Sequence, residues 1–171
     1  MYARAMRIGL ITCGELPEPD PDAAILDEGL RAAGHEPVMV AWDDPSMDAA
    51  GVRALKLDVL ALRSCWNYPE RPDAFLAWVR MAHGVTRVVN EPDVVAWNVH
   101  KGYLLELAAG GVPVVATRVV GRGGEAALPE DGEFDGGLVV KPAGGAGAVG
   151  ARRFGAEERD GALAYLRALS A

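Results

Sequence analysis

Two lysines and a glycine-rich loop are the residues of this sequence best suited to hold an anion. Lys141 ends the apolar run LVVK, and Pro142 follows it, so an extended strand is expected to stop there. The next stretch, Ala143-Gly144-Gly145-Ala146-Gly147-Ala148-Val149-Gly150, is built almost entirely of small residues. Such residues let backbone N–H groups approach phosphate oxygens, and a lysine adds a point charge. The pattern favours a phosphate-binding loop, with a plain hairpin turn as the alternative.

Two familiar nucleotide motifs fit this loop less well. Residues 145–150 satisfy GxGxxG, but that fingerprint of nicotinamide and flavin oxidoreductases runs directly from a strand into a helix. The residues that follow, ARRFG, are a poor helix start. The P-loop motif requires Gly-Lys-Ser/Thr, and this tripeptide does not occur in the sequence.

The second lysine, Lys101, lies beside His100 in the first turn of a helix expected over residues 98–109. The amino-terminal end of a helix already carries positive charge, so a lysine is disfavoured there unless an anion lies nearby. The alternative is an exposed lysine that is merely tolerated. Together, Lys101 and Lys141 are more informative than either alone, and we expect them to converge on one anion-binding site.

A third set of polar and aromatic residues follows an expected strand over residues 57–62. Arg63, Ser64, Trp66 and Tyr68 would lie at the carboxyl edge of the sheet, where open α/β sheets bind ligands. An arginine can hold a substrate carboxylate with two hydrogen bonds, and the serine can add another. Alternatively, Arg63 pairs with a local acid while Trp66 and Tyr68 pack at a junction between lobes.

The elements that must position these residues change character near residue 92. Before it, strands are expected over residues 7–13, 36–42, 57–62 and 86–90, with helices over 21–34 and 72–84. Asp22 can cap the first helix, whose inner face would carry Ile25, Leu26 and Leu30. Strands that alternate with helices predict parallel pairing, so residues 1–92 should form a Rossmann-like α/β lobe with helices on both faces of the sheet.

Residues 93–171 predict a smaller α+β lobe. We expect helices over 98–109 and 157–171, the latter with Leu163, Leu166 and Leu169 on one side, and strands over 112–120, 138–141 and 151–154. A loop between the first two of these strands carries five acids, Glu125, Glu130, Asp131, Glu133 and Asp135. Its composition is typical of solvated surface, so no metal site is predicted there.

Composition narrows the class of protein. The chain has 171 residues, half of them hydrophobic, and a formal net charge of -7. This charge argues against non-specific nucleic-acid binding. No signal peptide or membrane-spanning run is evident, and Cys13 and Cys65 follow no metal or disulfide pattern. We therefore expect a cytoplasmic protein with no membrane partner.

With these residues in view, the sequence resembles the ATP-grasp superfamily, especially its glutathione-synthetase-like and cycloserine-synthetase-like members. The stretches that carry the resemblance are DDPSMD, LRSCWNYPERPDAFLAWV, VVNEPDVVAWNVHKGYLLELAAGGVPVVATRVV and LVVKPAGGAGAVGARRF. The resemblance implies a pre-ATP-grasp lobe over residues 1–92 and a small nucleotide-binding lobe over 93–171. It also implies that Lys101 and Lys141 contact nucleotide phosphates, and that residues 143–150 close over them.

The resemblance further implies an ATP-dependent ligase that joins a carboxylate to an amine or similar nucleophile through an acylphosphate. Relatives commonly carry a serine in the loop, where this chain has Gly144-Gly145. The family's large lobe, with its acids for Mg²⁺, is not recognised here. We therefore expect this chain to bind ATP weakly or not at all, and to bind Mg²⁺ only when that lobe is supplied. The catalytic residues are unknown. Expected partners are a second copy, forming a homodimer mainly through residues 93–171, or a separate chain supplying the large lobe. A non-catalytic binding or assembly module is the alternative.

Overall fold

The computed structural model describes residues 4–128 and 136–171, and the chain divides into two compact units, Met1–Val99 and His100–Ala171. The sequence suggested a boundary at residue 92. The division falls later because helix α4 (Pro92–Asn98) follows and packs with the first unit, where Val95 is part of the buried core. Each unit is described by itself.

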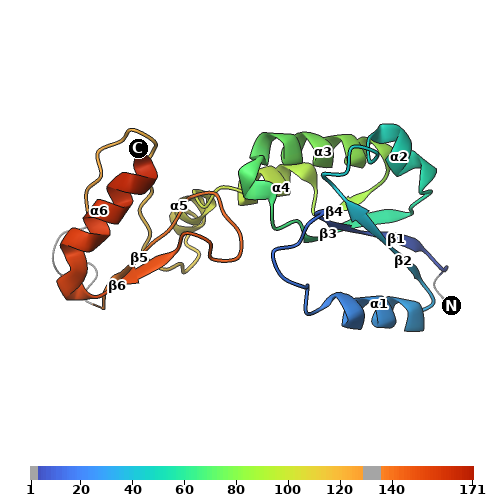
Figure 1. The fold of residues 1–171 in the computed structure, drawn as a ribbon, viewed down its shortest axis with the longest axis horizontal. Coiled ribbons are helices and arrows are strands. Elements are labelled where there is room, and N and C mark those ends of the chain that lie inside the picture. Colours follow the sequence, from blue (N-terminus) through green and yellow to red (C-terminus); the bar gives the residue numbers. More distant parts are fainter. Residues whose placement is uncertain (1–3, 129–135) are drawn as a thin grey trace. The chain divides into compact units, whose positions relative to one another are not determined.

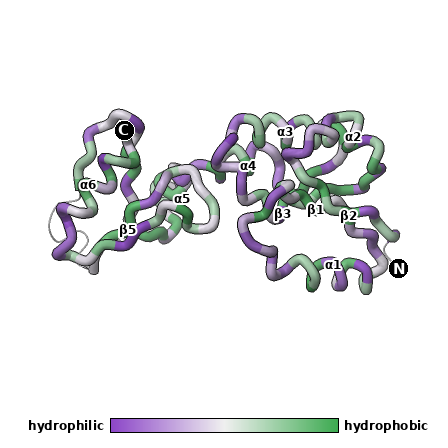
Figure 2. Tube along the Cα trace, viewed as in Figure 1, coloured by the Kyte–Doolittle hydropathy of each residue, from purple (hydrophilic) through white to green (hydrophobic). Residues whose placement is uncertain are grey.

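Unit 1 is built on a four-stranded parallel sheet with the strand order β2-β1-β3-β4 (Figure 1). Its strands are β1 (Arg7–Thr12), β2 (Glu36–Ala41), β3 (Val59–Ser64) and β4 (Val88–Val89). The predicted α/β class and the parallel sheet are confirmed. The apolar runs that predicted the strands are visible as hydrophobic segments of the chain trace in Figure 2.

Helices cover both faces of this sheet, as the alternation predicted. In Figure 1, α1 (Ala23–Ala32) lies on one face, and α2 (Ala49–Ala54), α3 (Pro72–Val85) and α4 lie on the other. A short 3-10 turn, η1 (Tyr68–Glu70), leads from β3 towards α3. Helix α2 was not predicted; the Asp48 carboxylate caps it by accepting hydrogen bonds from the N–H groups of Ala50 and Gly51, both at 2.9 Å.

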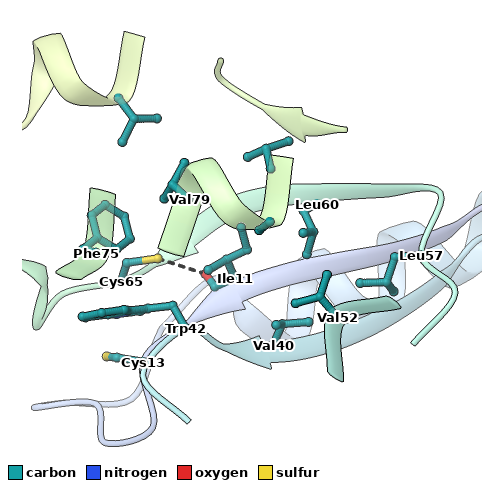
Figure 3. Close-up of a cluster of buried hydrophobic side chains, with 13 residues drawn as sticks. Ile11, Cys13, Val40, Trp42, Val52, Leu57, Leu60, Cys65, Phe75 and Val79 are labelled. Atoms are coloured by element: carbon teal, nitrogen blue, oxygen red, sulfur yellow. Dashed lines mark hydrogen bonds between the residues drawn. The ribbon is translucent and has the colours of Figure 1, made fainter. Parts of the chain in front are cut away.

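The core of unit 1 lies between the sheet and the helices α2 and α3 (Figure 3). Ile11, Val40 and Leu60 project from the strands towards Val52 of α2 and Val79 of α3, and all five side chains are fully buried. Each such burial contributes about 1.5–3 kcal/mol relative to exposure. This packing fixes the strands whose carboxyl ends carry the candidate site.

Helix α1 differs from its prediction in two ways. Of its expected inner face, Leu26 and Leu30 are half-buried, but Ile25 is 72 % exposed and no residue of the helix is fully buried. Asp22 occupies the N-cap position but makes no side-chain capping hydrogen bond. The Asp22 carboxylate instead forms an ion pair with Arg63 Nη2, at 3.3 Å.

Unit 2 contains α5 (Tyr103–Ala109), the antiparallel strand pair β5 (Leu138–Val140) and β6 (Arg152–Phe154), η2 (Ala156–Glu158) and α6 (Arg159–Ser170). Helix α6 packs against both strands. Its Ala162 is buried and Leu163 and Leu166 are half-buried, but Leu169 is exposed, so the predicted inner face is shorter than expected.

Two further predictions for this half of the chain were wrong. The helix expected over 98–109 begins only at Tyr103, as α5. Asn98 ends the separate helix α4, and a turn that contains Lys101 lies between the two. The Lys101 N–H donates to the Ala143 carbonyl at 2.7 Å, so this group is not available for helical pairing. Residues 112–120 form no strand, because β5 pairs with β6 and this segment takes part in no described sheet.

Among the described residues, no helix is long and apolar enough to cross a membrane. The two cysteines are free thiols buried in unit 1, and Cys65 Sγ lies 3.5 Å from the Ile11 carbonyl oxygen (Figure 3). Burial raises the pKa of the Cys65 thiol to about 12, so it is protonated at neutral pH. Of the five loop acids, Glu125 is described, whereas Glu130, Asp131, Glu133 and Asp135 lie outside the described residues.

Candidate functional sites

In unit 2, the structure brings Lys101 directly onto the glycine-rich loop. The Lys101 N–H bonds to the Ala143 carbonyl, and His100 forms an isolated antiparallel bridge with Gly144. The Lys101 ammonium then donates to the Gly145 carbonyl oxygen, with 3.1 Å between nitrogen and oxygen. The side chain and the backbone of Lys101 therefore both hold the loop, although Gly145 lies 44 residues after Lys101 in the sequence.

Lys141 lies close enough to Lys101 to influence the pKa of the Lys101 ammonium group. The pKa of Lys101 is lowered, first by partial burial and second by the positive charge of Lys141. In the described part of the chain, neither lysine forms a salt bridge with a carboxylate. Two neighbouring ammonium groups without a carboxylate repel one another, and a bound anion would relieve that repulsion.

The loop itself has the backbone of a tight turn. Gly147, Ala148 and Gly150 all adopt left-handed conformations, with φ of 58°, 58° and 70°. Ala148 is the informative one, since a side chain disfavours this region and such strain is concentrated at binding sites. A Cβ added at Gly150 would lie 2.9 Å from Pro142 Cγ, so glycine is required there. Tyr165 Oη donates to the Gly150 carbonyl at 2.9 Å and fixes the end of the loop.

The loop joins two antiparallel strands, β5 and β6, and no helix follows it directly. A dinucleotide fingerprint would run from a strand into a helix and place the pyrophosphate on the helix N-terminus. Residues 145–150 therefore match GxGxxG in sequence but lack the strand-to-helix context of a dinucleotide-binding site.

In unit 1, the four residues expected at the carboxyl edge of β3 have different environments. Ser64 is only 2 % exposed, and its hydroxyl donates to the Asp20 carboxylate. Arg63 Nη2 lies 3.5 Å from Asp20 and 3.3 Å from Asp22. The Ser64 hydrogen bond is the largest cause that lowers the pKa of Asp20, followed by the N–H of Asp22 and the charge of Arg63. Ser64 is thus committed to Asp20, and Arg63 pairs with local acids.

Trp66 and Tyr68 line a pocket of about 410 Å³ at the same edge of the sheet, which also includes Arg63. The Tyr68 ring packs on Phe75, with ring centroids 5.3 Å apart. Two asparagines that the sequence analysis did not select, Asn90 after β4 and Asn98 at the end of α4, complete the polar part of the lining. Asn90 closes the expected strand over 86–90, and its position at the carboxyl end of a parallel strand was the available signal.

Three further polar groups that the sequence analysis did not select, those of Trp42, Asp43 and Asn67, support the carboxyl edge of the sheet. Asp43 accepts hydrogen bonds from the Gly14 N–H at 2.7 Å and from Asn67 Nδ2 at 2.6 Å. Asn67 in turn accepts from the Trp42 indole N–H at 2.8 Å. The network ties the loops after β1, β2 and β3 together through two half-buried hydrogen bonds and one exposed hydrogen bond.

Comparison with known proteins shows that this chain is similar to the amino-terminal part of D-cycloserine synthetase DcsG. Residues 8–90 match the model of the family described as D-cycloserine synthetase DcsG, N-terminal domain. The cycloserine biosynthesis protein DcsG of Streptomyces lavendulae is 35 % identical over 135 residues, which cover 74 % of this chain and 42 % of that protein. The crystal structure of D-cycloserine synthetase DcsG matches with a TM-score of 0.77 at 27 % identity, covering 95 % of this chain and 55 % of that one.

Residues 8–90 match the DcsG N-terminal domain, and the resemblance to the amino-terminal part of cycloserine-synthetase-like ATP-grasp proteins is confirmed. The chain spans about half the length of these relatives.

Proposed function

We propose that this chain is the amino-terminal portion of an ATP-grasp ligase that activates a carboxylate as an acylphosphate for attack by an amine or similar nucleophile. In this proposal Lys101, Lys141 and the loop 143–150 hold the nucleotide phosphates. The observation that carries it is the placement of two lysines at one glycine-rich loop without a neighbouring carboxylate among the described residues.

These residues suit phosphates for a physical reason. Lysine supplies a point charge that neutralises phosphate oxygens, and a loop of small residues allows close backbone approach. Transfer of a phosphoryl group depends mainly on such positioning and charge neutralisation. The loop lacks the serine of many relatives, so we expect weak binding of nucleotide by this chain.

The described residues contain no group of three or more His, Cys, Asp or Glu side chains placed for a metal ion, and the proposal assigns them no metal. When bound, Mg²⁺ would neutralise the phosphates in such a ligase. Acids from the large lobe, or from a separate chain that supplies it, would have to hold it.

Calorimetric titration with ATP, with and without Mg²⁺, tests the proposal. Lys101→Met and Lys141→Met should each weaken ATP binding about ten-fold or more, since a hydrogen bond to a charged group is worth about 1.5–3 kcal/mol. Arg167→Gln on α6 is the matched control, because it removes one positive charge from the same unit without touching the loop. ATP binding that neither lysine variant changes would refute the phosphate site. Absence of any ATP binding would favour the alternative, a non-catalytic binding or assembly module.

A further inference from the structure

Helix α6 reaches the last residue of the loop 143–150 through one side chain, Tyr165. Its hydroxyl donates a hydrogen bond to the Gly150 carbonyl oxygen, at 2.9 Å. The Tyr165 ring is half-buried and packs on Phe154 of β6, with ring centroids 6.0 Å apart, a common separation for packed aromatic rings. The hydroxyl is therefore aimed at the loop by a ring that is itself held against the strand.

Arg152 adds a second contact to this ring. Its guanidinium carbon lies 4.4 Å from the centre of the Tyr165 ring, within the range of a cation–π contact. In the described part of the chain Arg152 forms no salt bridge with a carboxylate. Its partner across the strand pair is Val140, which is 7 % exposed, so both lie on the face that packs against α6. Arg152 therefore restrains the Tyr165 ring.

The loop is held near both ends and is free between them. The Lys101 ammonium bonds the Gly145 carbonyl near its start, and Tyr165 bonds the Gly150 carbonyl at its end. Between these points four backbone N–H groups donate to no other described residue, those of Ala146, Gly147, Ala148 and Gly150. Successive free N–H groups of a turn are the donors that bind phosphate oxygens. The directions in which these groups point depend on where the two ends are fixed.

The loop needs such fixed ends because its own side chains supply little. Seven of its eight residues are glycine or alanine, and the eighth, Val149, is 77 % exposed. Glycine loses more conformational freedom on ordering than any other residue. A loop that is ordered before its ligand arrives spares binding that cost. Loss of the Tyr165 hydrogen bond should therefore weaken phosphate binding although no contact to phosphate is removed.

We propose that Tyr165 is a positioning residue of the phosphate site, with Arg152 as its support. Its hydrogen bond fixes the end of the loop, so that the free N–H groups converge on one phosphate instead of being spread over several loop conformations. Tyr165 itself touches no ligand in this proposal. The inference rests on the proposed function and adds to it a contribution from α6.

The experiment is a calorimetric titration of the full chain with ATP and with inorganic tripolyphosphate, which has the phosphates but no nucleoside. Tyr165→Phe removes the hydroxyl and keeps the ring that contacts Phe154 and Arg152. It should weaken both ligands about five-fold, the usual effect of losing one hydrogen bond between uncharged groups. Arg152→Gln removes the cation–π contact and should weaken both about two-fold to five-fold.

Two matched controls separate these effects from loss of a hydroxyl or of a charge elsewhere. Tyr68→Phe removes a tyrosine hydroxyl from unit 1 and should leave both affinities unchanged. Arg167→Gln makes the same charge change as Arg152→Gln on α6, without touching the loop, and should also leave them unchanged.

A purely structural role of Tyr165 gives a different pattern. In that case Tyr165→Phe lowers the free energy of unfolding in urea but leaves the affinities of the folded protein unchanged. The positioning role predicts a signature in the free protein. The ¹³C signal of the Gly150 carbonyl should shift in Tyr165→Phe, and ¹⁵N relaxation should show larger motion of the amides of residues 146–150, while the amides of β5 and β6 keep theirs.

The inference is overturned if Tyr165→Phe binds both ligands as the unaltered chain does, or if the loop amides are equally ordered in the two proteins. Lys101→Met separates it from the proposed function. Binding that Lys101→Met weakens and Tyr165→Phe does not would refute only the positioning role. Absence of binding of both ligands to the unaltered chain would refute the phosphate site, and the positioning role with it, whatever the loop amides show.

Discussion

Replacing glycine by alanine at three positions of the loop 143–150 should give three different results, because the three glycines are needed for different reasons. Gly150 has a φ of 70°, and a Cβ there would lie 2.9 Å from Pro142 Cγ and 3.2 Å from Cδ. A left-handed backbone costs an alanine about 1–2 kcal/mol, and overlap with a rigid ring adds about 1–3 kcal/mol. Gly150→Ala should therefore destabilise unit 2 by about 2–5 kcal/mol.

At Gly147 only the first of these costs applies. Its φ is 58°, but no heavy atom lies within 4 Å of an added Cβ, so Gly147→Ala should cost about 1–2 kcal/mol. Gly145 has no left-handed φ, and the nearest atom to an added Cβ is Lys101 Nζ at 3.7 Å, an ordinary contact. Gly145→Ala should leave stability unchanged or raise it by about 0.4–1 kcal/mol, since it restricts the unfolded chain.

Urea titration followed by NMR signals from residues 152–170 measures these free energies of unfolding within unit 2 itself. The expected order of destabilisation is Gly150→Ala, then Gly147→Ala, then Gly145→Ala. Equal losses at all three positions, or the largest loss at Gly145, would refute the loop geometry. The same Gly145→Ala protein also tests the site, because its new methyl group lies beside the Lys101 ammonium and should weaken ATP binding although the fold is intact.

Three other predictions concern unit 1 and association. Ser64→Ala should cost about 1.5–3 kcal/mol at pH 7, because the Asp20 carboxylate loses a hydrogen bond. The folded-state pKa of Asp20 lies below its ordinary value of 3.8, so Asp20 stabilises the fold above that pH and loses this contribution as pH falls through the folded-state pKa. Ser64→Ala raises that folded-state pKa, so the loss of unfolding free energy on acidification, measured by urea titration at several pH values, should become smaller. A loss of the same size in the variant would contradict this role of the Ser64 hydroxyl. Gly51→Ala places a Cβ 1.9 Å from the Ser46 carbonyl oxygen and should destabilise unit 1 by several kcal/mol, whereas Gly84→Ala in α3 meets no atom within 4 Å and should stabilise it by about 0.5–1 kcal/mol in thermal unfolding. We also propose a homodimer formed mainly through residues 93–171, where Val115 is 85 % exposed; light scattering at micromolar concentration should give twice the 18.0 kDa of one chain, and a monomer would exclude it.

The fold of unit 1 could be predicted because its signals are local. Each strand of the sheet is an apolar run bounded by turn residues. Helix α3 repeats apolar residues at helical spacing, and Phe75, Val79 and Ala82 are buried. Helix α2 was not predicted because it has only six residues and includes Gly51, a poor helix former. Its usable signal was the capping residue Asp48 ahead of the apolar Val52.

The errors in residues 98–120 have a different origin, since they depend on partners distant in sequence. Residues 98–109 have helical periodicity, but the Lys101 N–H bonds to Ala143, and the chain turns there. Residues 112–120 are rich in valine, yet a strand exists only when another strand pairs with it. Propensity indicates only what a segment favours locally, whereas the pairing that decides its structure depends on residues distant in the sequence.

The candidate sites show the same division between residue type and pairing. The sequence predicted that Lys101 and Lys141 would converge on one site. The hydrogen bond of Lys101 to Gly145 and the effect of Lys141 on the Lys101 pKa became visible only in the structure. For Arg63, the sequence left substrate binding and pairing with an acid as alternatives. The structure shows the pairing, with Asp20 and Asp22 from a loop more than 40 residues earlier in the sequence, and binding of a substrate stays a prediction. A cation without an acid and a cation held by two acids are suited to different ligands. The former favours a strongly charged phosphate, whereas the charge of the latter is already partly neutralised.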